Sequence, residues 1–263
     1  MVQPGQPLPL RLTWQIQTPP ADTYTLFVHL MDDAGERWGQ VDGLPLGGLY
    51  PMHLWQPGIR YPDEWRLDLP SDLPPGRYRL ELGLYDLGTG DRLLLTDGPG
   101  KLPGDVLIVD YVTVPGGGEP KSPESILEAE FGGAIRLLGV SPELAGRPVR
   151  PGATVEVTLH WRVEAPTDQA YTLFAHVVGP DGLPLAQFDG PPQGGFYPTA
   201  FWDPGERLED RVALALPADT EPGEYPVVAG FYLFATGERL PVTGADATTA
   251  GDAVRLTTLV VEP

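Results

Sequence analysis

The chain has 263 residues, room for two domains of ordinary size, and its 41% hydrophobic content with 33 Gly and 32 Pro indicates a folded, turn-rich protein rather than a disordered one. Thirty-six Asp and Glu against 17 Lys and Arg give a formal net charge of -19, which argues against nucleic acid as a partner. There is no Cys, which excludes disulfides and thiolate metal sites, and no Asn, which together with the prolines fits a thermophilic source.

The first half of the chain consists of short β-branched and apolar runs separated by Pro, Gly and Asp, a pattern typical of an all-β sandwich. Leu80, Leu82 and Leu84 alternate with more polar or smaller residues, so this run predicts a strand with one buried face in an antiparallel sheet. The predicted strands of this half are 8–15, 24–32, 37–42, 59–69, 76–86 and 106–114.

Residues 115–125 mix flexible Gly with stiff Pro and contain no side chain that a core would bury. This composition predicts an exposed linker, with one domain in residues 1–114 and a second in residues 126–263. Residues 125–130 could form a helical turn, which would be too short to affect the fold.

The second half of the chain copies the first at a fixed offset of 147 residues. Trp14 recurs as Trp161 and Asp63 as Asp210, with no insertion or deletion between the copies. A repeat of this length is a whole domain duplicated once, because solenoid units are much shorter. The sequence therefore predicts two tandem antiparallel β-sandwiches, immunoglobulin-like or fibronectin-III-like, joined by a Gly/Pro linker. The strands expected in the second half are 154–164, 171–178, 185–189, 207–216, 223–234 and 254–261.

Repeat 2 begins with an additional apolar run at 129–140, expected to form one strand, whose counterpart in repeat 1 would precede residue 1. Repeat 1 is therefore predicted to lack its first strand, most simply because the polypeptide was cut from a longer protein. The alternative is a true open edge that pairs with a partner strand. Either way, repeat 1 is expected to be the less stable half, since such an edge exposes apolar surface and unpaired backbone groups.

The longest repeated block is Gly-Gly-aromatic-Tyr-Pro followed by Trp and Pro-Gly. Its rings Tyr50 and Trp55, duplicated as Tyr197 and Trp202, could stack on sugars and form a carbohydrate-binding site. The alternative is a long loop pinned by its own aromatics over one end of the sandwich. Because both copies keep the Gly and Pro that fix the backbone, the sequence favours the pinned loop. Exposed, coplanar rings would support sugar binding, and buried rings the structural role.

A second repeated feature pairs His29 with Asp42, and His176 with Asp189. A neighbouring His and carboxylate could bind a metal or act as a general base. Neither copy has a third partner at recognisable ligand spacing, so we predict hydrogen-bonded structural pairs, no metal site and no cofactor.

No catalytic residue is predicted. Two carboxylates at glycosidase separation are not excluded by the abundant Asp and Glu, which leaves a glycoside hydrolase as an alternative function. The few serines lie outside any Gly-x-Ser-x-Gly elbow, and no phosphate-binding Gly-rich loop occurs.

Several motifs recur in both halves: Tyr-Thr-Leu-Phe-x-His, Gln-x-Asp-Gly, Gly-Gly-x-Tyr-Pro-x-x-x-Trp-x-Pro-Gly, Pro-Gly-x-Tyr, and Gly-x-Tyr followed by Thr-Gly-x-Arg-Leu. In this pattern the chain resembles the β-sandwich regions C-terminal to the membrane part of large bacterial glycosyltransferase-like proteins of the dolichyl-phosphate-mannose-dependent mannosyltransferase type. The resemblance implies an extracytoplasmic location and an accessory role in holding or orienting glycan or an acceptor. The expected partner is glycan or another protein domain. It carries no catalytic residue, because the enzymatic centre of such proteins belongs to the membrane part.

No stretch of the sequence approaches the roughly 20 apolar residues needed to cross a bilayer, so no membrane insertion by this segment is expected, and the N-terminus shows no signal-peptide pattern. The sequence thus predicts a non-catalytic spacer or interaction module of a larger cell-surface or membrane protein, with a carbohydrate-binding module and a glycoside hydrolase as alternatives.

Overall fold

The structure, a computed structural model, describes residues 1–94, 104–116, 118, 120–142, 147–244, 246, 248 and 251–263. The chain divides into two compact units, Met1–Gly118 and Glu119–Pro263. Each unit is described by itself as unit 1 and unit 2. Part of the expected linker, residues 117 and 119, lies outside the described residues.

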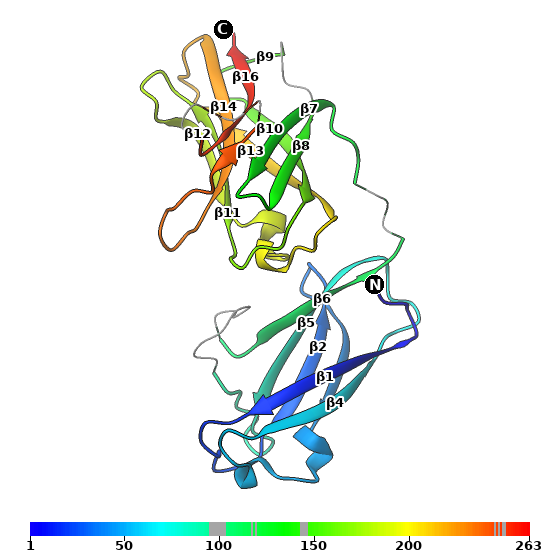
Figure 1. The fold of residues 1–263 in the computed structure, drawn as a ribbon. Helices are drawn as coiled ribbons and strands as arrows, with labels where there is room; N and C mark the ends of the chain where they lie inside the picture. The colour runs from blue at the N-terminus through cyan, green and yellow to red at the C-terminus, as the bar shows by residue number, and fades with distance from the viewer. Residues whose placement is uncertain are drawn as a thin grey trace. The chain divides into compact units, whose positions relative to one another are not determined.

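Unit 1 is a small sandwich of two antiparallel sheets (Figure 1). One sheet has four strands in the order β3-β2-β5-β6, and the other contains only β1 and β4. The strands are β1 (Pro7–Gln15), β2 (Thr25–Met31), β3 (Arg37–Gly43), β4 (Arg60–Asp68), β5 (Gly76–Tyr85) and β6 (Leu107–Val114).

The core of unit 1 lies between these two sheets. Leu26, Val28 and Leu30 alternate along β2 and face the core, where Leu67 of β4 and Leu80 of β5 meet them. The residues that β1 contributes to this core are only partly buried: Leu8, Leu10, Leu12 and Trp14.

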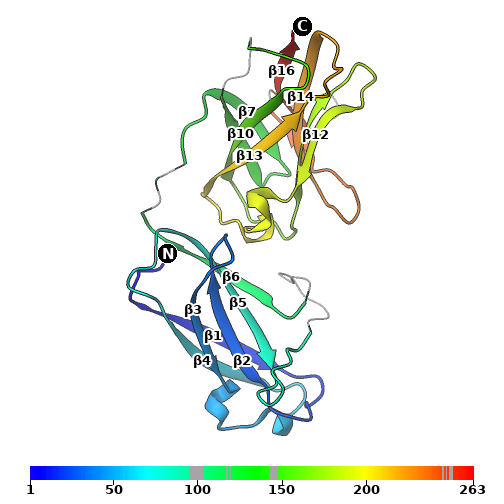
Figure 2. The same ribbon diagram turned by 180° about the vertical axis from the view of Figure 1, so that it is seen from behind.

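Unit 2 contains counterparts of all six strands and four strands more. The counterparts are β10 (Thr154–Val163), β11 (Thr172–Val178), β12 (Pro184–Gly190), β13 (Arg207–Ala215), β14 (Gly223–Tyr232) and β16 (Val254–Val261). The additional strands are β7 (Ser125–Phe131), β8 (Ile135–Ser141), β9 (Pro148–Val149) and β15 (Val242–Thr243). Two five-stranded sheets result, ordered β13-β10-β8-β7-β15 and β12-β11-β14-β16-β9; Figure 2 shows them from behind.

Three rings mark where the sheets of unit 2 face each other. Phe231 of β14 lies 5.1 Å from Trp161 of β10 and 5.3 Å from Phe131 of β7, measured between ring centroids. All three side chains are completely buried. This aromatic cluster joins the two layers, and one of its members comes from β7, which has no counterpart in the described part of unit 1.

The all-β fold of antiparallel sheets is confirmed, and the twelve strands predicted in the duplicated regions end within two residues of the observed bounds. Two expectations are wrong. The run 129–140 is not one strand, because Gly132 (φ 57°) and Gly133 (φ 71°) adopt left-handed conformations and turn the chain between β7 and β8. The segment 125–130 is not a helical turn but belongs to β7, where alternate side chains contact the sheet below.

No helix in the described part of the chain is long and apolar enough to cross a membrane.

Candidate functional site

The repeated Gly-Gly-aromatic-Tyr-Pro block forms the same loop in both units. In unit 1 it contains two short 3-10 turns, Pro45–Gly48 and Met52–Leu54, between β3 and β4; in unit 2 the turns are Pro192–Gly195 and Thr199–Phe201. Each loop reverses direction through a left-handed non-glycine residue, Leu46 (φ 56°) or Gln193 (φ 54°), followed by two left-handed glycines. The left-handed conformation of both glycines explains why the two copies retain Gly-Gly, since other residues would strain the backbone at these positions.

Hydrogen bonds from the ring groups close each loop on itself. The indole of Trp55 donates to the carbonyl of Tyr50 (2.8 Å), and that of Trp202 donates to the carbonyl of Tyr197 (2.9 Å). The Tyr50 hydroxyl in turn donates to the carbonyl of Leu54 (2.6 Å), and Tyr197 makes the equivalent bond to Phe201. The polar tips of these rings are thus used inside the loop.

The four rings proposed as a sugar-stacking surface do not form one. Trp55 is 1% exposed, Tyr197 2% and Trp202 2%, while Tyr50 is only partly buried. The face of Trp55 is covered by Tyr61, whose ring stacks on it at 4.7 Å. A ring can bind a sugar only if its face is open to solvent. The exposed rings that the sugar-binding alternative requires are therefore not found for Trp55, Tyr197 and Trp202; these rings are buried, as the pinned-loop interpretation requires.

A buried carboxylate fixes the neighbouring Trp in each unit. Asp63 accepts from the Trp14 indole at 2.9 Å, and Asp210 accepts from the Trp161 indole at 3.0 Å. Asp210 also accepts the backbone N–H of Gln193 at 2.6 Å, which ties the aromatic loop to the sheet. Burial raises the pKa of Asp210, and its hydrogen bonds to Gln193 and Trp161 oppose that rise.

The His and Asp pairs differ between the units. His176 Nε2 lies 3.0 Å from Asp189 Oδ2, within hydrogen-bonding distance. His29 Nε2 instead lies 3.4 Å from Nη1 of Arg37, and within the described residues no hydrogen bond joins it to Asp42. Burial, followed by the charge of Arg37, lowers the pKa of His29. Among the described residues, no group of three or more His, Cys, Asp or Glu is arranged to hold a metal ion.

A repeated cluster that sequence reasoning missed lies on the outer face of the β2 and β11 sheets. Phe27 lies opposite Gly83 of β5, where a Cβ would overlap the ring, and the guanidinium of Arg92 lies over that ring at 4.4 Å from its centroid. Asp105 holds Arg92 at 3.1 Å. Unit 2 repeats the arrangement with Phe174, Gly230, Arg239 and Asp252. The sequence signal that could have revealed this cluster is the shared offset of 147 residues between its members in the two units. The cluster attaches the connections that follow β5 and β14 to the sheet.

Ser141, His160 and Glu209 of unit 2 lie in the order of a nucleophilic triad. Ser141 Oγ is 3.0 Å from His160 Nε2, and Glu209 Oε1 is 3.5 Å from His160 Nδ1. The second distance exceeds that of a strong hydrogen bond, and the buried Nδ1 has no hydrogen-bond partner, so the carboxylate does not orient the ring as acyl transfer requires. Ser141 and Glu209 instead accept the backbone N–H groups of Glu124 and Lys121, which attaches this segment to the sheet.

The environment of His160 leads to a prediction for the pH dependence of stability. Burial is the largest influence on the pKa of His160 and lowers it below the ordinary value of 6.5. The charge of Glu209 and the hydrogen bond with the backbone of Lys121 raise the pKa by less, and the charge of Arg207 lowers it further. As the pH falls through about 6.5, the unfolded chain therefore binds the proton first, and the free energy of unfolding decreases until the lower folded-state pKa is passed.

The variant His160→Gln is accordingly expected to flatten this part of the pH profile, measured by urea unfolding between about pH 7 and pH 5. His53→Gln, a substitution at an exposed loop position of unit 1, is the matched control and should leave the profile of unit 2 unchanged. An unaltered slope in His160→Gln would contradict the prediction.

Glycoside hydrolysis needs a protonated carboxyl group that faces the substrate. In the part of the chain that the structure describes, Asp210 is the carboxyl group whose pKa is raised. Both of its oxygens are occupied, and the residue is buried against Trp161 and Gln193. Asp210 is thus placed to hold the core together and not to protonate a leaving group.

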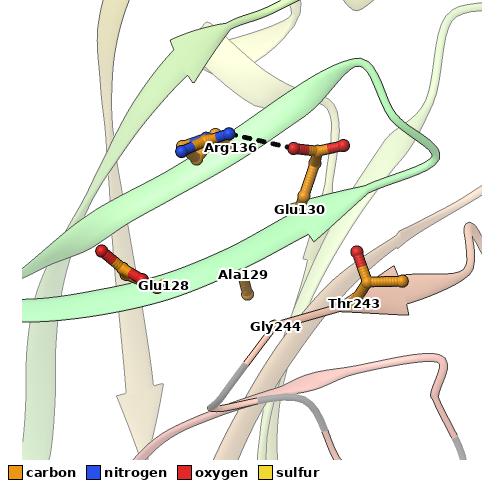
Figure 3. Close-up of a pocket in the computed structure, with 6 residues that line it drawn as sticks. All are labelled: Glu128, Ala129, Glu130, Arg136, Thr243 and Gly244. Carbon is orange, nitrogen blue, oxygen red and sulfur yellow. Dashed lines mark hydrogen bonds and ion pairs between the residues drawn. The ribbon is translucent and has the colours of Figure 1, made fainter.

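A small polar pocket opens beside β7 in unit 2 (Figure 3). Its volume is about 190 Å³, and its lining residues are Glu128, Ala129, Glu130, Arg136, Thr243 and Gly244. Arg136 is engaged on both sides, by Glu130 at 3.1 Å and by Glu164 at 2.9 Å. One guanidinium is thus shared by two carboxylates, and Glu128 adds a further acidic group to the lining. The pocket therefore carries an excess of negative charge and is not suited to select an anion.

Comparison with known proteins gives no family. No protein-family model matches the chain, and no curated protein matches it. Two solved structures align over its whole length: the C-terminal domain of the AgI/II polypeptide BspA of Streptococcus agalactiae, at 11% identity and a TM-score of 0.24, and the C-terminal domain of the antigen I/II-family protein AspA of Streptococcus pyogenes, at 10% and 0.25. In both alignments 94% of the other chain is covered. Scores this low establish no common fold.

Proposed function

We propose that this chain is a non-catalytic tandem β-sandwich module that serves as a spacer or interaction domain of a larger extracytoplasmic protein, at the cell surface or in the envelope. The observation that carries the proposal is the nature of what the two units share. The duplicated residues with the largest side chains have structural contacts in both units. Trp55 and Trp202 are buried and close the aromatic loop, while Trp14 and Trp161 bind Asp63 and Asp210 across paired strands. Retention of the same interior in both copies suits a scaffold.

The polar groups support the same proposal. The Ser141, His160 and Glu209 arrangement has no counterpart in unit 1, where Thr13 and Pro62 occupy the positions of His160 and Glu209. The duplicated Arg and Asp pairs cover the rings of Phe27 and Phe174 instead of facing an open cleft. The proposal includes an extracytoplasmic location. It also includes a parent protein of the glycosyltransferase-associated kind that the repeated motifs resemble.

A glycan array probed with the intact chain tests this function. We expect no saturable binding, because the loop rings are buried. Any glycan that binds would be titrated against Trp55→Ala, Trp202→Ala and, as a matched control, Phe234→Ala, which removes an 81% exposed ring. Binding that is lost in a folded Trp variant and kept in the control would overturn the proposal in favour of a carbohydrate-binding module.

A further inference from the structure

We propose that the free edge of β1 in unit 1 is a docking site for a partner hairpin, an amphipathic β-hairpin that residues 1–263 do not supply and that is similar in chemistry to the β7–β8 hairpin of unit 2. The inference gives the partner class for the interaction role proposed above and rests on that role. Unit 2 provides the template, because it shows what covers the same face in a second copy of the same domain.

The position of the docking site follows from the strand order. In unit 2, β10 lies between β13 and β8, whereas its counterpart β1 pairs only with β4 within the described residues (Figure 1). β8 pairs with Thr158–Val163 of β10, from Thr158 opposite Ser141 to Val163 opposite Ile135. Subtraction of the 147-residue offset places the equivalent edge at residues 11–16 of unit 1.

The backbone of this edge is able to pair. Thr13 lies opposite Pro62 of β4, and because proline has no N–H, the two residues cannot exchange the double hydrogen bond of a bonded antiparallel pair. The N–H and C=O of Thr13 therefore point away from β4, toward the free edge. The prolines of β1, Pro7 and Pro9, precede the stretch that corresponds to the β8 contact, so residues 11–16 retain every N–H donor.

The inward side chains next to this edge are incompletely covered. Val155, Val157 and Leu159 of β10 are buried, at 4%, 1% and 0% exposure, whereas their counterparts Leu8, Leu10 and Leu12 are only partly buried. The uncovered face is thus apolar and continuous with the core of unit 1, which is the surface an amphipathic hairpin would remove from water.

The tryptophans identify what the hairpin contributes. Trp161 is completely buried and contacts Phe131 of β7 edge to face at 5.7 Å. Trp14 is only partly buried; its ring neighbour is Trp55, at 6.4 Å and on the side of the aromatic loop. The place that Phe131 fills beside Trp161 therefore has no corresponding residue beside Trp14 in the described part of unit 1. We expect an apolar, preferably aromatic, residue of the partner to fill it.

The charges of the two surfaces are complementary. The exposed face of the β1–β4 sheet carries three arginines and two carboxylates: Arg11, Arg60, Arg66, Glu64 and Asp68. Arg11 pairs with Glu64 at 3.6 Å and Arg66 with Asp68 at 2.8 Å, so the excess on this face is one positive charge. The β7–β8 hairpin and the residue before it carry three glutamates and one arginine: Glu124, Glu128, Glu130 and Arg136. In a chain of net charge -19, a surface with an excess of arginine favours an acidic hairpin.

A second copy of the chain is the less suitable occupant. Its own β7–β8 hairpin is already bound in unit 2, where Phe131, Ile135 and Leu137 are completely buried. Removal of the hairpin to pair with another molecule would expose these side chains. The inference therefore commits to an acidic amphipathic hairpin that no copy of residues 1–263 supplies.

The test uses the full chain and a fluorescently labelled synthetic peptide of residues 123–142. We expect saturable one-to-one binding with new protection from hydrogen exchange at the amides of residues 11–16, while protection at 158–163 is unchanged. Thr13→Pro should weaken the binding at least about tenfold, because it removes a donor from the free edge, and Thr13→Val, which keeps the donor, should not. A peptide carrying Leu137→Asp should also bind at least about tenfold more weakly, which tests the proposal even if Thr13→Pro does not fold.

Three results would overturn the inference: no saturable binding, equal binding by folded Thr13→Pro, or self-association of the chain that Thr13→Pro abolishes, which would identify a second copy as the occupant. Loss of protection at 158–163 would likewise overturn it, because the peptide would then be exchanging with β8 in unit 2. Failure of the peptide to bind leaves the glycan-array result untouched, so the two proposals can fail separately.

Discussion

Replacement of Trp202 by Ala should lower the free energy of unfolding of unit 2 by about 3–5 kcal/mol, the usual cost of removing a buried Trp side chain. The ring is 2% exposed and packs edge to face against Phe231 at 6.4 Å. Its indole N–H also satisfies the buried carbonyl of Tyr197, so the variant leaves a cavity together with an unpaired acceptor. Urea unfolding followed by far-UV circular dichroism would measure the loss.

Phe234→Ala is the control for this prediction, since it removes a comparable ring from the same unit at a position that is 81% exposed. We expect it to change the stability of unit 2 by less than about 0.5 kcal/mol. A Trp202→Ala protein as stable as Phe234→Ala would show that the ring is not required for folding and would return the aromatic loop to consideration as a binding surface.

The sequence was sufficient to predict the twelve strands of the duplicated regions because the period-2 pattern and the turn residues are local signals. Duplication strengthened them, since each run could be compared with its copy, as for Phe27 and Phe174. The turn at Gly132 and Gly133 was missed because the apolar runs on either side join into one when only hydrophobicity is considered. Burial of the rings was left open for a different reason: an aromatic loop that folds back on a sandwich and one that extends into solvent use the same residue types.

The site predictions show the limit of reasoning from a repeat. Identical residues at identical offsets have different neighbours, as His29 and His176 demonstrate: the position of Arg37 beside His29 is Pro184 in unit 2, and His176 meets Asp189 instead. The cluster of Ser141, His160 and Glu209 was invisible in the sequence because its members come from three strands brought together by β-sheet pairing. Side-chain partners across strands depend on strand order, which no local pattern specifies.

The same Trp in the two units gives the second large prediction. Trp161→Ala should destabilise unit 2 by about 3–5 kcal/mol, whereas Trp14→Ala should cost unit 1 roughly half as much. The two side chains make the same hydrogen bond, to Asp210 and to Asp63, so this contribution is matched. They differ in burial, because Trp161 lies against Phe131 and Phe231, while Trp14 borders the free edge of β1.

The measurement is thermal or urea unfolding of the intact chain, with each unit expected to unfold in its own transition. Unit 1 should unfold first, since its inner β1 face is only partly covered, and Trp14→Ala should move that first transition alone. If Trp14→Ala shifts the more stable transition, or costs as much as Trp161→Ala, the free edge is not a weakness of unit 1. The apolar face of β1 would then need no partner, and the argument for a docking hairpin would lose its energetic basis.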